Sequence, residues 1–377
     1  MSPLQIEILE STREFAALEE EWEELYHNSP LATPFQSWAW LYSWWEFYGD
    51  GHELRLITVR GGDGLLVGLL PLMLERRGGF GKLLLVGTGL TDYLDVLVRE
   101  GWEDAVSEAG VATVRRMGSW HLADLQQLRP EAAARVIFGR WPGRCVSVWQ
   151  DGCPVLDLKP WDELLMTISK SHRKTARRAL RRAEEDGVRR ELVSLADAEE
   201  AARRLVSLQR ELWKGRNIGS EHLTRRFECH VVAAVSRMMA RGLGGIFELW
   251  RDGQVIISQF WISGKDSLGL YIVGASREAV ERYQWSSLLM WHSLATTLGN
   301  KRSRLDLLRG EDPYKLQWGP EIIPNHRLIL GRHWITWAPY TGYHVLHSKA
   351  RRYVNSESAP RWVKSAAHGF RALRHRR

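Results

Sequence analysis

The side chains best suited to chemistry lie between residues 305 and 319, which read LDLLRGEDPYKLQWG. Asp306 follows a short apolar run typical of a strand, a Gly-Pro loop comes next, and Tyr314 and Lys315 return on the following element. This order brings a carboxylate, a phenol and an ammonium group within reach of one cleft. Such groups can transfer protons and stabilise developing negative charge.

The elements that must position this cluster occur twice in the chain. Residues 54–74 form an apolar run, a Gly-Asp-Gly turn and a second apolar run, and residues 247–262 repeat the pattern around an Asp-Gly turn. Asp-Gly between β-rich runs predicts a tight hairpin. Each hairpin is followed by a helix-like stretch and a short strand with an aspartate, Asp124 in the first copy and Asp306 in the second. We therefore expect two similar lobes, with the active site in the second.

The chain length and element order set the expected architecture. A chain of 377 residues is long enough for two domains, each with its own core. The order of elements is mixed α/β, with grouped strands and helices packed around them. We expect an N-terminal domain at 1–153, a C-terminal domain carrying the site at 154–345 and a basic tail at 346–377. The stretch from Pro154 to Pro160 is interpreted as the connector between the halves.

Composition narrows the class of protein. The hydrophobic content of 44% and the charged content of 26% are typical of a soluble globular protein. The first fifteen residues lack the pattern of a signal peptide, and the apolar run at 65–74 is too short to span a bilayer. Three cysteines without metal-ligand spacing indicate a reducing cytoplasm. His344 and His347 have no acidic or cysteine partner nearby, so no metal is expected.

Positive charge is concentrated at the C-terminal end. Residues 349–377 contain nine Lys or Arg and one Glu, although the whole chain has a net charge of only +7. A helix with Trp362, Ala366, Phe370 and Leu373 roughly on one side can form there. Basic amphipathic helices bind anionic membrane surfaces, so such a surface is a predicted partner. A solvated, frayed terminus is the alternative.

A second basic segment, residues 170–182, reads KSHRKTARRALRR and contains no acid. Arg173, Arg177 and Arg181 share one helix face, which favours a phosphate-bearing partner. A solvated face neutralised by the acidic residues just beyond is the alternative. The segment has no interleaved aromatic side chains and no recognised nucleic-acid motif. We therefore expect no nucleic-acid partner, except tRNA under the alternative donor considered below.

Nineteen tryptophans are many for a chain of this length. An indole face complements the apolar side of a sugar ring, while its N–H finds a hydrogen-bond acceptor. Most tryptophans are nevertheless core residues. Trp38 is the first candidate for a contact with a sugar-like substrate.

The ordered motifs resemble a known family. The string DLLRG-(x)3-YK-(x)2-WG at residues 306–319, the preceding helix, the Asp-Gly hairpin and the basic helix resemble the CelD/BcsL family of GNAT-like acyltransferases. The similarity extends to FQSWAWLYSWWEFYGDG at 35–51 and DYLDVLV at 92–98, and covers most of residues 30–330. Tyr314-Lys315-(x)2-Trp318-Gly319 is also similar to the Phe-Lys-x-x-Phe-Gly signature of the Fem aminoacyltransferases, which are double GNAT modules.

This resemblance implies tandem GNAT-like domains, each a central mixed β-sheet flanked by helices. It implies transfer of an acyl group, typically acetyl, from acyl-CoA to an amine or hydroxyl of a saccharide, glycan precursor or other polar metabolite. Asp306 or Glu311 would then act as the base, Tyr314 as the acid, and Lys315 as a group that stabilises the oxyanion. Alternatively, Asp306 only caps a turn and Lys315 only pairs with Glu311.

The resemblance also implies binding residues. The acyl-CoA would contact Trp285, Ser286 and Ser287 at a helix start, together with Gln259, Arg173 and Arg177. Family members carry Ser-Pro-Gly at that helix start, whereas this chain has Gln284-Trp285-Ser286. Ser286 can cap the helix, but the lost glycine removes the closest backbone approach to phosphate, and Trp285 crowds it. The acceptor substrate would contact Asp92, Tyr93, Asp95 and Trp38.

Two other functions stay open at this point. One is a Fem-like transferase that uses aminoacyl-tRNA, which the basic segments would suit. The other is a non-catalytic binding protein in polysaccharide or envelope assembly. In each case we expect a cytoplasmic protein, attached peripherally to the inner face of the membrane if the tail binds lipid.

Overall fold

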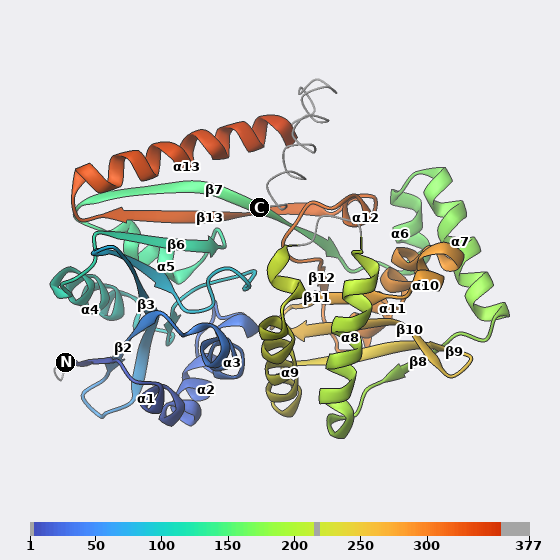
Figure 1. The fold of residues 1–377 in the computed structure, drawn as a ribbon, viewed down its shortest axis with the longest axis horizontal. Helices are drawn as coiled ribbons and strands as arrows, with labels where there is room; N and C mark the ends of the chain where they lie inside the picture. Colours follow the sequence, from blue (N-terminus) through green and yellow to red (C-terminus); the bar gives the residue numbers. More distant parts are fainter. Residues whose placement is uncertain (1–3, 215–218, 356–377) are drawn as a thin grey trace. The chain divides into compact units, whose positions relative to one another are not determined.

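The computed structural model describes residues 4–214 and 219–355, which group into two compact units (Figure 1). The described residues of unit 1 are 4–151 and 324–355, and those of unit 2 are 152–214 and 219–323. The sequence predicts that the second domain extends to residue 345. Residues 324–345 instead group with unit 1, because strand β13 pairs with a strand of that unit.

Unit 1 is built on a sheet with the strand order β1-β2-β3-β4-β6-β13. These strands are β1 (Gln5–Leu9), β2 (His52–Arg60), β3 (Leu66–Arg77), β4 (Phe80–Leu85), β6 (Leu122–Leu128) and β13 (Glu321–Gly331). All neighbours are antiparallel except β4 and β6, which are parallel. The short β5 (Leu97–Val98) pairs with β3, and β7 (Arg144–Asp157) follows β13 in the strand order.

Helices surround this sheet. They are α1 (Thr12–Ala17), α2 (Glu19–His27), the short 3-10 helix η1 (Pro34–Gln36), α3 (Trp38–Tyr48), α4 (Glu103–Arg116), α5 (Ala133–Gly139) and α13 (Trp334–Asn355). The core between α4, α5 and the strands consists of Leu, Val, Ile and Phe side chains that are almost fully buried. Gly68 in β3 is required there, because a Cβ atom would lie 2.6 Å from Val106 of α4.

Unit 2 has the same kind of sheet, in the order β7-β12-β11-β10-β9-β8. Its further strands are β8 (Arg189–Leu192), β9 (Gly244–Arg251), β10 (Gln254–Ser263), β11 (Ser267–Ala275) and β12 (Arg304–Asp306). Again all neighbours are antiparallel except one pair, β11 and β12.

The helices of unit 2 cover both faces of its sheet. They are α6 (Trp161–Thr167), α7 (Lys170–Glu185), η2 (Leu195–Asp197), α8 (Ala198–Leu212), η3 (Ser220–Leu223), α9 (Arg225–Ala240), α10 (Arg277–Tyr283), α11 (Trp285–Gly299) and α12 (Pro313–Leu316). Helix α8 packs on β10 and β11, where a Cβ on Gly274 would lie 2.5 Å from that of Leu208. Helices α7 and α11 contact each other and share a core with β11 and β12.

The repeat predicted from the sequence is present. The stretches at 54–74 and 247–262 form the antiparallel hairpins β2–β3 and β9–β10. In each unit an antiparallel meander leads through helices to a parallel strand, β6 or β12, and these strands carry Asp124 and Asp306. The mixed α/β fold class is therefore confirmed.

The predicted connector at 154–160 is wrong for its first four residues. Strand β7 continues to Asp157, and its Leu156 pairs with Leu305 of β12. Strand β7 thus enters unit 2 from the first half of the chain, while β13 returns from the second half to β6 of unit 1.

Within residues 4–214 and 219–355, no helix combines the length and the apolar character that crossing a membrane requires. In the same described ranges, no group of three or more His, Cys, Asp or Glu side chains is arranged to hold a metal. The predicted amphipathic segment around Trp362 to Leu373 lies outside the described residues.

Candidate functional site

Asp306 supports a tight turn at the end of β12. Its side chain is buried, and its Oδ1 accepts a hydrogen bond from the backbone N–H of Leu308 at 2.8 Å. Leu308 has a φ of 57°, in the left-handed region that residues other than Gly, Asn and Asp rarely adopt. The carboxylate therefore stabilises an unfavourable backbone conformation, as expected if Asp306 caps a turn.

Lys315 holds the next part of the same loop. Its buried Nζ donates to the carbonyl oxygens of Arg309 at 2.8 Å and Leu308 at 3.4 Å, and lies 4.0 Å from Asp312 Oδ2. A buried ammonium group needs such acceptors, because loss of water would otherwise be costly. Asp306 and Lys315 are thus brought together as anchors of one loop. The first binds an amide of Leu308, and the second binds its carbonyl.

Glu311 of the same loop lies against strand β7. A Cβ atom on Gly152 would lie 2.8 Å from Glu311 Oε1, so glycine is needed for the carboxylate to approach the strand. The Glu311 side chain is only partly buried. It is therefore the most accessible of the predicted acid–base carboxylates.

Residues 314–317 lie over the first turn of α11. The ring centroids of Tyr314 and Trp285 are 4.9 Å apart, and Gln317 Nε2 donates to Ser286 Oγ at 3.2 Å. Trp285 is buried by this contact, while Tyr314 is half-buried. The phenol and the predicted cofactor-binding turn therefore belong to one site.

The start of α11 differs from the prediction in one respect. Gln284, with φ 54° and ψ 63°, occupies the N-cap position, so Ser286 is the second helical residue rather than the cap. The reason is the left-handed Gln284, which joins α10 directly to α11 and accepts a bond from the Ser287 amide at 2.8 Å. Within the described residues, the buried Ser287 hydroxyl has no hydrogen-bond partner.

Strand β11 extends beyond the end of its partner β12. Strand β11 pairs with β12 only up to Gly269 and Asp306, although β11 continues to Ala275. The register with β10 shifts at the next residues, leaving Tyr271 as an extra residue in β11. Bulges of this kind often adjoin active sites, where they redirect the backbone. Beyond Gly269, β11 therefore has no partner in β12, and its Val273 shares a core with Trp285 in the first turn of α11.

Gln259 adds a buried polar group to the α11 face of the sheet. It lies on β10 opposite Val273, which shares a core with Trp285. Its Nε2 donates to the carbonyl of Phe260 at 2.5 Å, and its Oε1 has no partner within the described part of the chain. Its predicted contact with acyl-CoA stays a prediction.

The predicted phosphate ligands of α7 make only local contacts among the described residues. Arg173 contacts the sulfur of Met166 and the carbonyl of Ile168, while Arg177 lies 3.5 Å from Asp162. Nothing in these contacts connects either guanidinium with the first turn of α11.

Sequence reasoning missed one residue that contacts the loop, His172 of α7. The ring of His172 lies tilted against that of Trp318, at 4.8 Å between ring centroids, and hydrogen-bonds to the carbonyl of Gln317. Burial lowers the pKa of His172 below its usual value. In the sequence, His172 stands among the arginines of the basic segment 170–182, which we interpreted by its charge. The contact between His172 and Gln317 joins distant parts of the chain, so no periodic pattern could predict it.

The predicted substrate residues of unit 1 have structural contacts. Asp95 accepts hydrogen bonds from the amides of Ala133 (2.9 Å), Ala134 (2.7 Å) and Val96 (2.8 Å), and so caps α5. Burial outweighs these bonds and raises the pKa of Asp95 to about 6. These contacts identify Asp95 as a helix cap within unit 1.

The other three residues are also buried. The backbone carbonyl of Asp92 accepts from Asn325 at 2.9 Å, and that of Tyr93 accepts from Gln36 at 2.7 Å. Trp38 is only 5% exposed, stacks on Tyr42 at 4.4 Å and donates its N–H to the carbonyl of Phe15. Its indole therefore belongs to the core of unit 1, while the loop anchors and the α11 turn belong to unit 2.

A comparison with protein families gives a match that lies within unit 2. Residues 170–316, all within unit 2, match the family model described as an acetyltransferase (GNAT) domain. No curated protein gives a significant match to the chain.

Solved structures share the fold over most of the chain. FemX is 10% identical, with a TM-score of 0.60 over 86% of this chain and 96% of that one. The C-terminal domain of a putative lysylphosphatidylglycerol synthetase from Agrobacterium fabrum is 12% identical, with a TM-score of 0.54 over 93% and 99%. The L-PGS structure from Bacillus licheniformis is 12% identical, with a TM-score of 0.53 over 88% and 95%.

Proposed function

We propose that unit 2 transfers an acyl group, in the first instance acetyl, from acyl-CoA to an amine or hydroxyl of a saccharide, glycan precursor or other polar acceptor. The observation that carries this proposal is the acid-free first turn of α11, against which Tyr314 and Gln317 of the loop pack. The match of residues 170–316 to an acetyltransferase domain supports it. Membership of the CelD/BcsL family is part of the same proposal.

The first turn of α11 has the chemistry to hold a pyrophosphate. Backbone N–H groups at a helix start carry partial positive charge and bind anions. Ser286 and Ser287 add hydroxyl groups, and the hydroxyl of Ser287 has no partner among the described residues. Trp285 and Tyr314 would border the cofactor, with Gln317 hydrogen-bonded to Ser286 between them.

The residues of the loop would then divide the chemistry. Glu311, the partly exposed carboxylate, would take the proton of the attacking amine or hydroxyl as the new bond to the acyl carbon forms. The carbon–sulfur bond breaks, and Tyr314 would protonate the departing thiolate. We assign Asp306 and Lys315 as positioning residues, because their hydrogen bonds hold the backbone of residues 308 and 309.

Thermal unfolding with acyl-CoAs tests the cofactor assignment. A ligand that binds only the folded state raises the midpoint in proportion to the logarithm of its concentration over its Kd. We expect acetyl-CoA to raise the midpoint of the wild type and of Leu298→Glu, which adds the same charge near the other end of α11. Ser286→Glu should abolish the rise. Equal stabilisation of Ser286→Glu would contradict the proposed cofactor site.

A second candidate is transfer from aminoacyl-tRNA. Its support is the fold shared with FemX and the exposed basic side of α7, which carries Lys174, Arg178 and Arg182. Aminoacyl-tRNA binding that weakens steeply with salt, together with no response to any acyl-CoA, would favour this donor. Loss of that binding in Lys174→Glu/Arg178→Glu would assign it to α7. Ligand binding without turnover, unchanged in Asp306→Asn and Lys315→Ala, would instead indicate a binding protein.

A further inference from the structure

Helix α13 is firmly attached to unit 1 along one face. Trp337 donates its N–H to the carbonyl of Ile329 at 3.3 Å, and Tyr340 donates its hydroxyl to Asp124 at 2.7 Å. Near the other end of the helix, Arg351 forms an ion pair with Asp151 at 2.5 Å. These contacts fix the rotation of α13, so the direction of its opposite face is also fixed.

That opposite face is strongly apolar. Five large apolar or aromatic side chains of α13 are more than half exposed: Trp334 (62%), Ile335 (66%), Tyr343 (51%), Leu346 (70%) and Tyr353 (51%). In the described part of the chain, no other helix has more than two exposed large hydrophobic residues. Ile335, Leu346 and Tyr353 are separated by eleven and seven residues, close to three and two helical turns, and so form one line. We call this line and its neighbours the α13 outer face.

The charge around the outer face has a single sign. Among residues 334–355 there is no Asp or Glu, whereas Lys349, Arg351 and Arg352 are cationic. The sequence that follows, 356–377, adds six Lys or Arg and only one Glu. A surface that is apolar along its centre and basic at its edge is complementary to an anionic, partly apolar partner.

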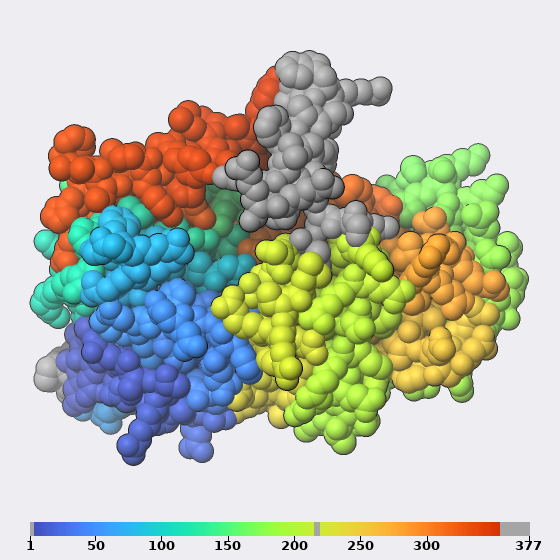
Figure 2. Space-filling view, viewed as in Figure 1, coloured from blue at the N-terminus to red at the C-terminus, as the bar shows by residue number. Residues whose placement is uncertain are grey.

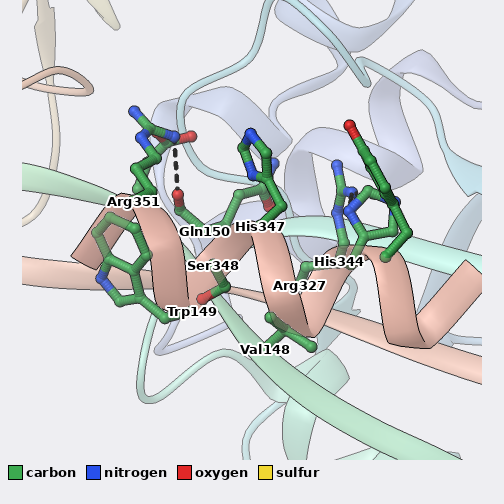
Figure 3. A pocket seen from close by; sticks show the side chains of 10 residues that line it. Val148, Trp149, Gln150, Arg327, His344, His347, Ser348 and Arg351 are labelled. Carbon is green, nitrogen blue, oxygen red and sulfur yellow. Dashed lines mark hydrogen bonds and ion pairs between the residues drawn. The ribbon is translucent and has the colours of Figure 1, made fainter. Parts of the chain in front are cut away.

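The flank of α13 contains a cavity of about 200 Å³, from which His344, His347 and Arg351 rise on one side of the helix (Figure 3). The cations lining the cavity are already paired, Arg351 with Asp151 and Arg327 with Asp124 at 3.2 Å. Burial and the neighbouring Arg327 lower the pKa of His344 to about 4, so its imidazole is neutral near pH 7. The cavity therefore has little net charge, and the unbalanced positive charge lies at Lys349 and Arg352 on the exposed side.

We propose that the α13 outer face is a docking surface for the surface of an anionic phospholipid bilayer. Leu346, Ile335 and Tyr353 would enter the boundary between headgroups and acyl chains, while Lys349 and Arg352 meet lipid phosphates. Trp and Tyr side chains favour this boundary, because one end of each ring is apolar and the other can hydrogen-bond. Figure 2 shows α13, in red, as an outer layer of unit 1. This inference is independent of the proposed acyl transfer.

Sedimentation of the full-length protein with vesicles tests the proposal. Vesicles of phosphatidylcholine alone are compared with vesicles containing phosphatidylglycerol, at low and high salt. We expect binding only to the anionic vesicles, weakened by salt. Leu346→Glu should reduce the partition coefficient about tenfold or more, because a leucine leaves the interface and a charge must be hydrated. Lys349→Glu/Arg352→Glu should also weaken binding.

Val136→Glu is the matched control, since Val136 is 53% exposed on helix α5 of the same unit. It should bind anionic vesicles like the wild type. Thermal unfolding of all variants verifies that they fold, and Leu346 is exposed enough for its variant to do so. Undiminished vesicle binding by Leu346→Glu and Ile335→Glu would overturn the proposal, because another segment would then carry the binding. Absence of vesicle binding, with Leu346→Glu converting a dimer into a monomer, would overturn it in favour of self-association.

Discussion

The helices that lead into the parallel strands of the two units begin with opposite chemistry. Helix α4 of unit 1 has Glu103 and Asp104 in its first turn, and Glu103 accepts a bond from the Gly101 amide at 3.1 Å. Helix α11 of unit 2 has no acid there and begins with Trp285, Ser286 and Ser287. The carboxylates of α4 already occupy the positive end of that helix, whereas α11 leaves it to an external anion. Under the proposed function, the same strand order would therefore support a binding site in unit 2 only.

The strand aspartates differ in the same way. Asp124 of β6 is fully buried, accepts from Tyr340, and lies 3.2 Å from Arg327. Asp306 of β12 accepts a hydrogen bond from the Leu308 amide and so supports a local turn. One aspartate holds a helix and a strand of its unit together, and the other shapes a loop beside the candidate site.

The largest effect should come from Asp124→Asn. The change leaves the buried Arg327 guanidinium without its counter-charge, and breaking a buried pair in this way costs about 3–5 kcal/mol of unfolding free energy. Asp306→Asn should cost less, because the asparagine Oδ1 can still accept the bond from the Leu308 amide. Urea unfolding of both variants measures the difference. A larger loss for Asp306→Asn would reverse the roles assigned to the two aspartates.

Lys315→Met should have the next largest effect on stability. Methionine fills a similar volume but leaves the carbonyls of Leu308 and Arg309 without their donor, at a cost of about 1–3 kcal/mol. Because the loop also contacts α11, the stabilisation by acetyl-CoA should decrease as well. Unfolding with and without the cofactor measures both quantities. A stable variant with unchanged cofactor response would argue against Lys315 as an anchor of the site.

The raised pKa of Asp95, in unit 1, predicts that the stability of the protein depends on pH. This pKa is about 6 in the folded protein, above that of an unfolded aspartate, so the folded state binds the proton more tightly. This contribution to stability is complete below about pH 4 and is lost as the pH rises through 6. The protein should therefore gain about 1 kcal/mol from this group between pH 7 and pH 5. Asp95→Asn should remove that part of the pH profile, and an identical profile would exclude Asp95 as its source.

The smallest effect is expected from Glu103→Ser/Asp104→Ser in α4. Removing the two exposed carboxylates from this helix start should cost about 0.3 kcal/mol each, the lower end for a surface charge near a helix terminus, and salt should reduce the difference. The variant makes the first turn of α4 more like that of α11. Calorimetric titration with acetyl-CoA should still give one site per chain, since unit 1 lacks the loop that contacts α11. A second site would mean that the acids alone distinguish the two units.

The features predicted correctly from the sequence depend on neighbouring residues. The hairpins at 54–74 and 247–262 follow from local turn chemistry, and Asp306 and Lys315 both bond to the backbone of Leu308 in one short loop. Their functional roles stay predictions. Pro154 is the first residue of the predicted connector, yet its carbonyl accepts from Leu307 at 2.8 Å inside the sheet.

The features that were missed depend on distant pairing. His172 and Gln317 are far apart in the chain, and β13 pairs with a strand about two hundred residues earlier. No spacing rule connects such segments. Burial was also underestimated for Asp95 and Trp38, whose polar atoms are used inside unit 1.

The pairing of β13 with β6 has a consequence for biosynthesis. Strand β6 ends at Leu128, but its neighbour β13 begins only at Glu321, after unit 2 has been translated. At about 5–20 residues per second, the ribosome needs roughly 10–40 s to produce the intervening chain. Throughout that interval the edge of β6 has no β13 to cover it, and such edges template aggregation. The nascent chain should therefore need a chaperone most while unit 2 is emerging, and a stop codon shortly before residue 321 should yield an insoluble product.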